Sequence, residues 1–184
     1  MSNRHPLLKR GAIAAIAFAL SNTLTAASAG ATTEGRVKAA YLFKLASFVK
    51  WPSDAFGGAG DPLRICVAGR DDVAIVVEAL VRGQRAGGRS LLAERIDAQS
   101  PEKALRCQIL FVGRAEPAAR DLLELVDERP ILTVTDQSAG SRGGIIEFVS
   151  VNGSVRFAIH RDAAEARRLI LSSKLLSVAE SLEP

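Results

Sequence analysis

The stretch from Arg36 to Pro52 constrains the fold of this chain more than any other. Of its 15 positions from Val37 to Trp51, 11 are apolar. Apolar residues recur at helical spacing on one side and cover much of the opposite side, so the pattern predicts a helix buried on more than one face. Because the residue before a proline disfavours helical geometry, we expect the helix to end at Trp51. The main apolar stripe consists of Val37, Ala40, Tyr41, Leu45 and Phe48.

Two interpretations of this helix stay open. It is either a central core helix only, or a core helix that also presents aromatic side chains to a second copy or another protein. Aromatic residues dominate the binding energy of many protein interfaces, so they are the natural candidates for such contacts. The candidate interface residues are Tyr41, Phe43, Phe48 and Trp51.

The first 29 residues have the pattern of a secretory signal peptide. A basic start precedes an apolar run at 11–20 and small residues at 27–29. This order is typical of export signals, and the apolar run is too short to anchor the protein across a bilayer. We expect cleavage after Ala29, with Ala31 as the alternative, and therefore an exported mature domain at 30–184.

The net charge changes when the predicted signal peptide is removed. The whole chain carries a formal charge of +4, and the first 29 residues contribute three basic side chains and no acidic ones, which leaves +1 for the mature domain. A nearly neutral domain lacks the basic surface that nucleic-acid binding requires. We therefore expect no nucleic-acid partner.

Two cysteines, Cys66 and Cys107, lie in the predicted mature domain. In an exported, oxidising compartment the simplest interpretation is one disulfide between them. Two free, buried thiols are the alternative. Nothing resembles the Cys-x-x-Cys spacing of a redox-active pair.

The remaining pattern predicts an α/β fold. Apolar runs alternate with helical patterns, and Asn152-Gly153 is a strong signal for an antiparallel hairpin. We expect a single three-layer domain with a mixed, mostly parallel sheet, a C-terminal antiparallel hairpin and the long first helix. If the strand order around 63–68 is 2-1-3, the two cysteines lie on adjacent strands. The expected strands are 63–68, 90–96, 107–112, 131–135, 145–151 and 155–160, and the later helices are 72–81, one opening at 116–117, and 161–181.

The sequence offers no credible catalytic set. The mature domain has one histidine, His160, which cannot form a structural zinc site, and no G-x-S-x-G motif accompanies it. No carboxylate cluster has the spacing of metal ligands. We therefore expect no enzymatic activity, no metal and no cofactor.

One turn is a candidate ligand site. Gly69, Arg70 and Asp71 follow a predicted strand and precede a predicted helix, and Asp136 ends another predicted strand. Small anions and other ligands bind at such positions in α/β folds. The alternative is that these residues form only an ordinary turn and helix cap.

Several motifs resemble the YfiR-like family of periplasmic proteins, and the resemblance covers essentially the whole mature domain. The first and last motifs are long and distinctive in order and spacing. The motifs are VKAAYLFKLASFVKWP at 37–52, CQILFVG at 107–113, LTVTD at 132–136, GGIIEFV at 143–149 and VRFAIHRDAAEARRLILSSKLLSVA at 155–179.

This resemblance implies a non-enzymatic periplasmic regulator, often a homodimer. It would bind the periplasmic sensing domain of an inner-membrane diguanylate cyclase and repress that enzyme, so that cyclic di-GMP and biofilm formation fall. The resemblance also implies an outer-membrane lipoprotein as a possible second partner, and a structural disulfide at Cys66 and Cys107. The second cysteine pair of some members is absent here.

Two other functions compete with the regulatory one. A periplasmic small-molecule-binding protein that serves a sensor kinase or a transporter would need a pocket near Gly69, Asp71 and Asp136. A hydrolase would need His160 as its base, and we expect no such activity.

Overall fold

The computed structural model describes residues 31–97, 99–114 and 117–184. The predicted signal peptide at 1–29 and its cleavage site after Ala29 lie outside the described residues. Among the helices in the described ranges, none is long and apolar enough to cross a membrane.

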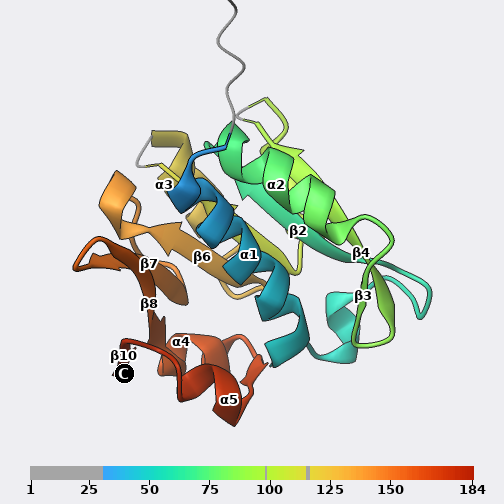
Figure 1. Cartoon of the computed structure of the whole chain (residues 1–184). Helices are drawn as coiled ribbons and strands as arrows, with labels where there is room; N and C mark the ends of the chain where they lie inside the picture. Colours follow the sequence, from blue (N-terminus) through green and yellow to red (C-terminus); the bar gives the residue numbers. More distant parts are fainter. Residues whose placement is uncertain (1–30, 98, 115–116) are drawn as a thin grey trace, which may run out of the picture.

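A mixed, mostly parallel sheet lies at the centre of the described fold (Figure 1). Neighbouring strands from β4 to β7 are parallel, β8 runs antiparallel to β7, and β10 adds to β8 in parallel. The order β4-β2-β5 is the 2-1-3 arrangement, which was the condition for the two cysteines to lie on adjacent strands. In sheet order the strands are β10 (Ser181–Glu183), β8 (Ser154–His160), β7 (Ile146–Val151), β6 (Leu132–Asp136), β5 (Ile109–Val112), β2 (Leu63–Ala68), β4 (Arg89–Ile96) and β3 (Arg85–Ala86).

Helices cover both faces of this sheet, which confirms the predicted three-layer α/β class. α1 (Thr33–Phe48) and α2 (Asp71–Val81) pack on one face over the larger core cluster (Figure 1). α3 (Pro117–Leu125) and the 3-10 helix η2 (Pro101–Arg106) cover the other face over a smaller cluster. Both faces of the sheet are therefore buried, which explains why the sequences of the central strands are continuous apolar runs.

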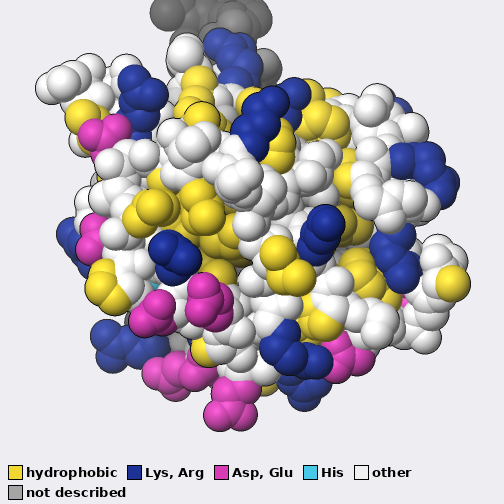
Figure 2. All heavy atoms as spheres, turned by 90° about the horizontal axis from the view of Figure 1, so that it is seen from below, with side chains coloured by type: hydrophobic (Ala, Val, Ile, Leu, Met, Phe, Trp, Pro, Cys, Tyr) yellow, Lys and Arg dark blue, Asp and Glu magenta, His cyan; other side chains and the backbone are white. Residues whose placement is uncertain are grey.

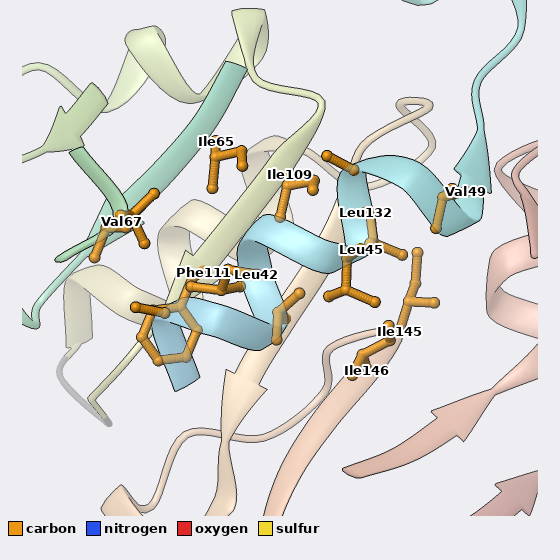
Figure 3. Close-up of a cluster of buried hydrophobic side chains, with 14 of the residues drawn as sticks. Leu42, Leu45, Val49, Ile65, Val67, Ile109, Phe111, Leu132, Ile145 and Ile146 are labelled. Carbon is orange, nitrogen blue, oxygen red and sulfur yellow. The ribbon is translucent and has the colours of Figure 1, made fainter. Parts of the chain in front are cut away.

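The buried side of α1 matches the predicted main stripe only in part, because Leu45 is buried whereas Val37 and Ala40 are exposed. The side chains of Leu42 and Leu45 point from α1 towards the strands of the sheet (Figure 3), whereas Val37 is 38% exposed. The buried side includes Lys38, which the apolar pattern treats as an interruption. The helix begins at Thr33, where the Oγ1 of Thr32 accepts a hydrogen bond from the N–H of Gly35 at 2.9 Å. The buried residues of α1 are Gly35, Lys38, Ala39, Leu42, Leu45 and Ala46.

α1 also ends earlier than predicted. Its last residue is Phe48, and Val49–Lys50 forms the short strand β1, which pairs antiparallel with β9 (Ile170–Leu171). The prediction that the helix continues to Trp51 is wrong, because pairing with a distant segment overrides the local helical pattern. The 3-10 helix η1 (Ser53–Ala55) follows directly after Pro52.

The single terminal helix predicted at 161–181 is wrong. α4 (Arg161–Ala166) ends when Arg168 adopts the left-handed conformation at φ 58°. The N–H of Leu169 donates to the carbonyl of Ala164, and that of Arg168 donates to Glu165, which is a Schellman termination. The chain then forms β9, α5 (Ser173–Leu176) and β10.

The hairpin prediction is confirmed. β7 and β8 pair from Val151 and Ser154 outward, and the connecting Asn152 and Gly153 both have positive φ, at 49° and 74°. Two consecutive positive φ values are the signature of the tight turn that matches strand twist, and Asn-Gly is the preferred pair for it. This turn places β8, and then the C-terminal segment, at one edge of the sheet.

Candidate functional site

A buried lysine marks the first turns of α1. Lys38 has 1% of its surface exposed, and its Nζ lies 2.5 Å from Oδ2 of Asp136, the fully buried last residue of β6. The same ammonium donates to the carboxylate of Glu34, one turn earlier in α1, and to Oγ of Ser138 at 3.2 Å. These contacts use all three donor positions of the ammonium.

Arg70 reaches the same carboxylate from the end of β2. Its Nη1 lies 3.2 Å from Oδ2 of Asp136, while Nε and Nη2 donate to the two oxygens of Asp72 at 2.8 and 3.0 Å. The hydrogen bond and charge of Arg70 lower the pKa of Asp72 from 3.8 to about 2, although partial burial acts in the opposite direction. Asp72 is therefore ionised and paired at neutral pH.

Glu34, Lys38, Arg70, Asp72 and Asp136 form an ionic cluster, and the two buried groups at its centre, Lys38 and Asp136, have their hydrogen-bonding groups filled. The second oxygen of Asp136 accepts a hydrogen bond from Oγ of Ser138 at 2.6 Å, so both carboxylate oxygens have partners. The described residues also contain no group of three or more His, Cys, Asp or Glu side chains placed to hold a metal ion. The cluster cross-links α1, the end of β2 and the end of β6 through the buried Lys38–Asp136 pair, while Glu34 lies at its solvent-exposed edge with 51% of its side chain exposed.

Sequence reasoning found part of this cluster and missed its centre. Asp136 and Arg70 were singled out as candidates, but Lys38 was counted as a break in an apolar helix. A lysine within an apolar helical face must be paired when buried, because an unpaired buried charge is very costly. The sequence signal is therefore the lysine within an apolar helical face, which indicates a buried partner, while the identity of that partner, Asp136, depends on the fold.

The predicted ligand turn is only partly assembled around Asp136. Arg70 contacts Asp136, and Gly69 has a φ of 73° that suits glycine. Asp71 points to solvent, with 88% of its side chain exposed and Arg95 at 3.4 Å. An open depression adjoins this turn, and a ligand there stays a prediction. The depression is lined by Thr32, Gly69, Arg70, Asp71, Asp72, Arg114 and Ala139.

The four predicted interface aromatics are partly buried against the larger core cluster. The ring of Tyr41 lies 5.9 Å from that of Phe148 and 5.4 Å from that of Phe157, so it packs over β7 and β8. Phe43 is half-buried on α1. Their role in an interface stays a prediction.

Phe48 and Trp51 lie at the opposite end of α1 and contact different segments. The carbonyl of Phe48 accepts a hydrogen bond from Ser172 at 2.9 Å, and Lys174 lies 5.8 Å from its ring. The Nε1 of Trp51 donates to the carbonyl of Gln108 at 3.0 Å. Phe48 therefore adjoins the C-terminal segment, whereas Trp51 is tied to the start of β5.

A disulfide joins Cys66 to Cys107 across the smaller core cluster. The two Cα atoms are 6.0 Å apart, and 41 positions separate the residues in sequence. Cys66 lies in the middle of β2 and Cys107 directly after η2, two residues before β5, and both are buried. The bond therefore links two adjacent strands on the face covered by α3 and η2.

The C-terminal segment carries an exposed apolar surface, which we define as Ile170, Val178 and Leu182 and call the C-terminal surface. These side chains are 65%, 59% and 47% exposed. In the view from the side of α4 and α5, hydrophobic side chains gather among separate charged ones (Figure 2). A cavity of about 230 Å³ adjoins Ile170. It is lined by Arg161, Ala164, Glu165, Leu169, Ile170, Leu171 and Leu176.

The fold and these sites define an α/β domain with a buried ionic cross-link and exposed apolar side chains, which is an arrangement suited to binding. A family model described as YfiR/HmsC-like matches residues 35–180. The chain therefore belongs to the YfiR/HmsC-like family, and the resemblance drawn from its motifs is confirmed.

Proposed function

We propose that this chain is a periplasmic, non-enzymatic regulator that binds the periplasmic sensing domain of an inner-membrane diguanylate cyclase and represses it. Repression would lower cyclic di-GMP. Membership of the YfiR/HmsC-like family supports this proposal, and so does the export signal predicted at 1–29. An outer-membrane lipoprotein that sequesters the regulator, and a homodimer, are further parts of the same proposal.

The exposed C-terminal surface is the observation that carries the proposal. Ile170 is the most exposed of the large hydrophobic side chains in the described part of the chain. Large apolar side chains left in water are unfavourable, and where they gather on one face they mark interaction sites. Phe48 adjoins the same segment, so the predicted aromatic contact and the C-terminal surface can serve one partner.

A regulator without chemistry acts by binding one state of its partner more tightly than another. Reversing a strong preference between two states requires about 5 kcal/mol of differential affinity. A rigid surface serves this purpose better than a mobile one, since less conformational entropy is lost on binding. The Schellman termination and the pairing of β9 with β1 hold Ile170 in a defined position.

A cellular experiment tests the regulatory role. Deletion of the gene is expected to raise cellular cyclic di-GMP, and expression of the intact chain is expected to restore it. An unchanged cyclic di-GMP level in the deletion strain would contradict the proposal.

A binding experiment tests the surface. The purified mature chain is expected to co-elute with the periplasmic domain of the cyclase, and Ile170→Glu is expected to weaken that complex at least tenfold. Ile75→Glu is the matched control, because Ile75 is a 46% exposed isoleucine on α2, away from the C-terminal segment. Equal loss of binding in both variants would argue against the C-terminal surface as the interface.

A further inference from the structure

A second cavity, separate from the C-terminal surface and from the ionic cluster, is lined by residues from the end of α1, from β1, from the segment around η1 and from the β3–β4 hairpin. Its volume is about 430 Å³, which falls within the range of small-molecule sites. The lining is mainly apolar and includes two aromatic rings. The lining residues are Ala46, Val49, Lys50, Trp51, Ser53, Phe56, Leu63, Ala86, Gly87 and Arg89.

Hydrogen bonds from one buried residue hold both aromatic walls. The carbonyl of Gln108 accepts from Nε1 of Trp51 at 3.0 Å, and its side-chain Nε2 donates to the carbonyl of Ala55 at 2.7 Å. Its Oε1 accepts from the N–H of Arg64 at 2.8 Å. The wall that carries Trp51 is thus tied to the backbone of Gln108 and the wall that carries Phe56 to its side chain, so one residue holds both walls in place.

Arg89 fixes the remaining wall. Its guanidinium lies 3.7 Å from the ring centroid of Phe56. Its Nη1 donates to the carbonyls of Gly58 and Asp61 at 2.8 Å each and to that of Ala59 at 3.2 Å. This side chain orders the loop after η1, so the aromatic ring is held against the cavity without a ligand.

The charges around the cavity have one sign. Among its lining residues the charged ones are Lys50 and Arg89, both basic. Asp54, the nearest acidic residue along the chain from Ser53, is paired with Arg168 at 2.9 Å. Arg89 is engaged with the loop carbonyls, while Lys50 is exposed at the edge on β1. A ligand that fits therefore combines a flat apolar body with a negative group.

We propose that this cavity binds a small aromatic carboxylate. The ring would pack between Trp51 and Phe56, where aromatic pairs add stability beyond the area they bury, and the carboxylate would pair with the ammonium of Lys50. This inference does not depend on the proposed regulatory function. It concerns a different surface and a different kind of ligand.

The intrinsic fluorescence of the mature chain gives a direct test, because Trp51 is its only tryptophan. Titration with benzoate is expected to change the Trp51 emission saturably. Benzylamine, which has the same ring and the opposite charge, is expected to give no saturable change. A linear response to benzoate, or equal responses to both compounds, would overturn the proposal.

Two variants separate the charge from the cavity. Lys50→Ala is expected to weaken benzoate binding about tenfold, as the loss of one charge-assisted hydrogen bond does. Lys44→Ala, an exposed lysine of α1 that does not line the cavity, is the matched control and is expected to bind normally. Unchanged affinity in Lys50→Ala would overturn the assignment.

Ser53→Phe is expected to fill the cavity and abolish the benzoate response, with its fold checked by circular dichroism. If this variant does not fold, the comparison of Lys50→Ala with Lys44→Ala decides the question. Light scattering accompanies the titration. A change in oligomeric mass in Ser53→Phe without any benzoate response in the parent would mean that a second copy covers the cavity, and would overturn the ligand proposal.

Discussion

At its first turns α1 meets charged groups, and at its last turn it meets apolar ones. Lys38 is buried beside Asp136, and its ammonium donates hydrogen bonds to Asp136, Glu34 and Ser138. The other end, near Phe48, leads into a cavity lined by Trp51 and into the exposed C-terminal surface. At the ionic end the charged groups satisfy one another and so cross-link the fold, whereas the apolar end is the part for which we propose binding to other molecules.

The largest expected effect on stability comes from the ionic end. Lys38→Met leaves Asp136 buried with one fewer cation, and removal of one partner of a buried pair destabilises by about 3–5 kcal/mol. We expect a loss of that order in the free energy of unfolding, measured by urea denaturation. Lys44→Met, on the exposed side of the same helix, is the control and should change it by less than about 0.5 kcal/mol. Similar midpoints for the two variants would show that the pair is not a stabilising cross-link.

The disulfide stabilises the opposite face of the sheet. Because it closes a loop with a sequence separation of 41, Cys66→Ser should lower the free energy of unfolding by about 2–4 kcal/mol, and Cys107→Ser by a similar amount. Chemical denaturation of the unreduced proteins measures both. Labelling of either cysteine by a thiol reagent in the native, unreduced protein would rule the bond out.

Lowering the pH should reduce the free energy of unfolding, because protonation of Asp72 breaks its ion pair with Arg70. The folded pKa of about 2 lies below the ordinary 3.8, so this pair contributes its full stability above about pH 4 and loses it as the pH falls towards 2. Because Asp72 is partly exposed and solvent screens the pair, we expect the contribution to be about 1 kcal/mol. Asp72→Asn should remove this part of the pH dependence, whereas Asp71→Asn, at an exposed carboxylate, should keep the parent profile. Identical profiles for the parent and Asp72→Asn would contradict this account.

The smallest effect on stability is expected at the apolar end. Ile170→Ser should change the free energy of unfolding by no more than about 0.5 kcal/mol, because the side chain is 65% exposed. Leu45→Ala, which removes a side chain that is 3% exposed, should cost about 2–5 kcal/mol. A large loss in Ile170→Ser would assign this residue to the core and remove it from the binding surface.

Local patterns predicted those parts of the fold whose causes are local. The central strands appeared as continuous apolar runs because helices bury both faces of the sheet, and Asn152-Gly153 predicted the hairpin because its turn needs two positive φ values. The helix predicted at 161–181 failed for the opposite reason. Pairing of Ile170 with Lys50, far away in sequence, competes with helix formation and is invisible in a local window.

The candidate site residues also fall into two groups, those that the sequence indicated and those that only the fold brings together. The sequence indicated Cys66 with Cys107 and the turn at Arg70, because residue type and position were informative there. It treated Lys38 as an interruption, since nothing nearby in sequence shows that Asp136 will lie 2.5 Å away. It also grouped Tyr41 with Trp51, which the fold places against different neighbours.

By itself the sequence determined the α/β class, the central strands, the hairpin and the family. Only the tertiary structure decided which side of α1 is buried, where the C-terminal segment turns, and which charged and aromatic groups meet. The physical reason is that apolar periodicity and turn preferences act over a few residues. The pairing of a buried charge, or the opening of a cavity, depends on segments that the folded chain brings together from about a hundred residues apart, as Lys38 and Asp136 are.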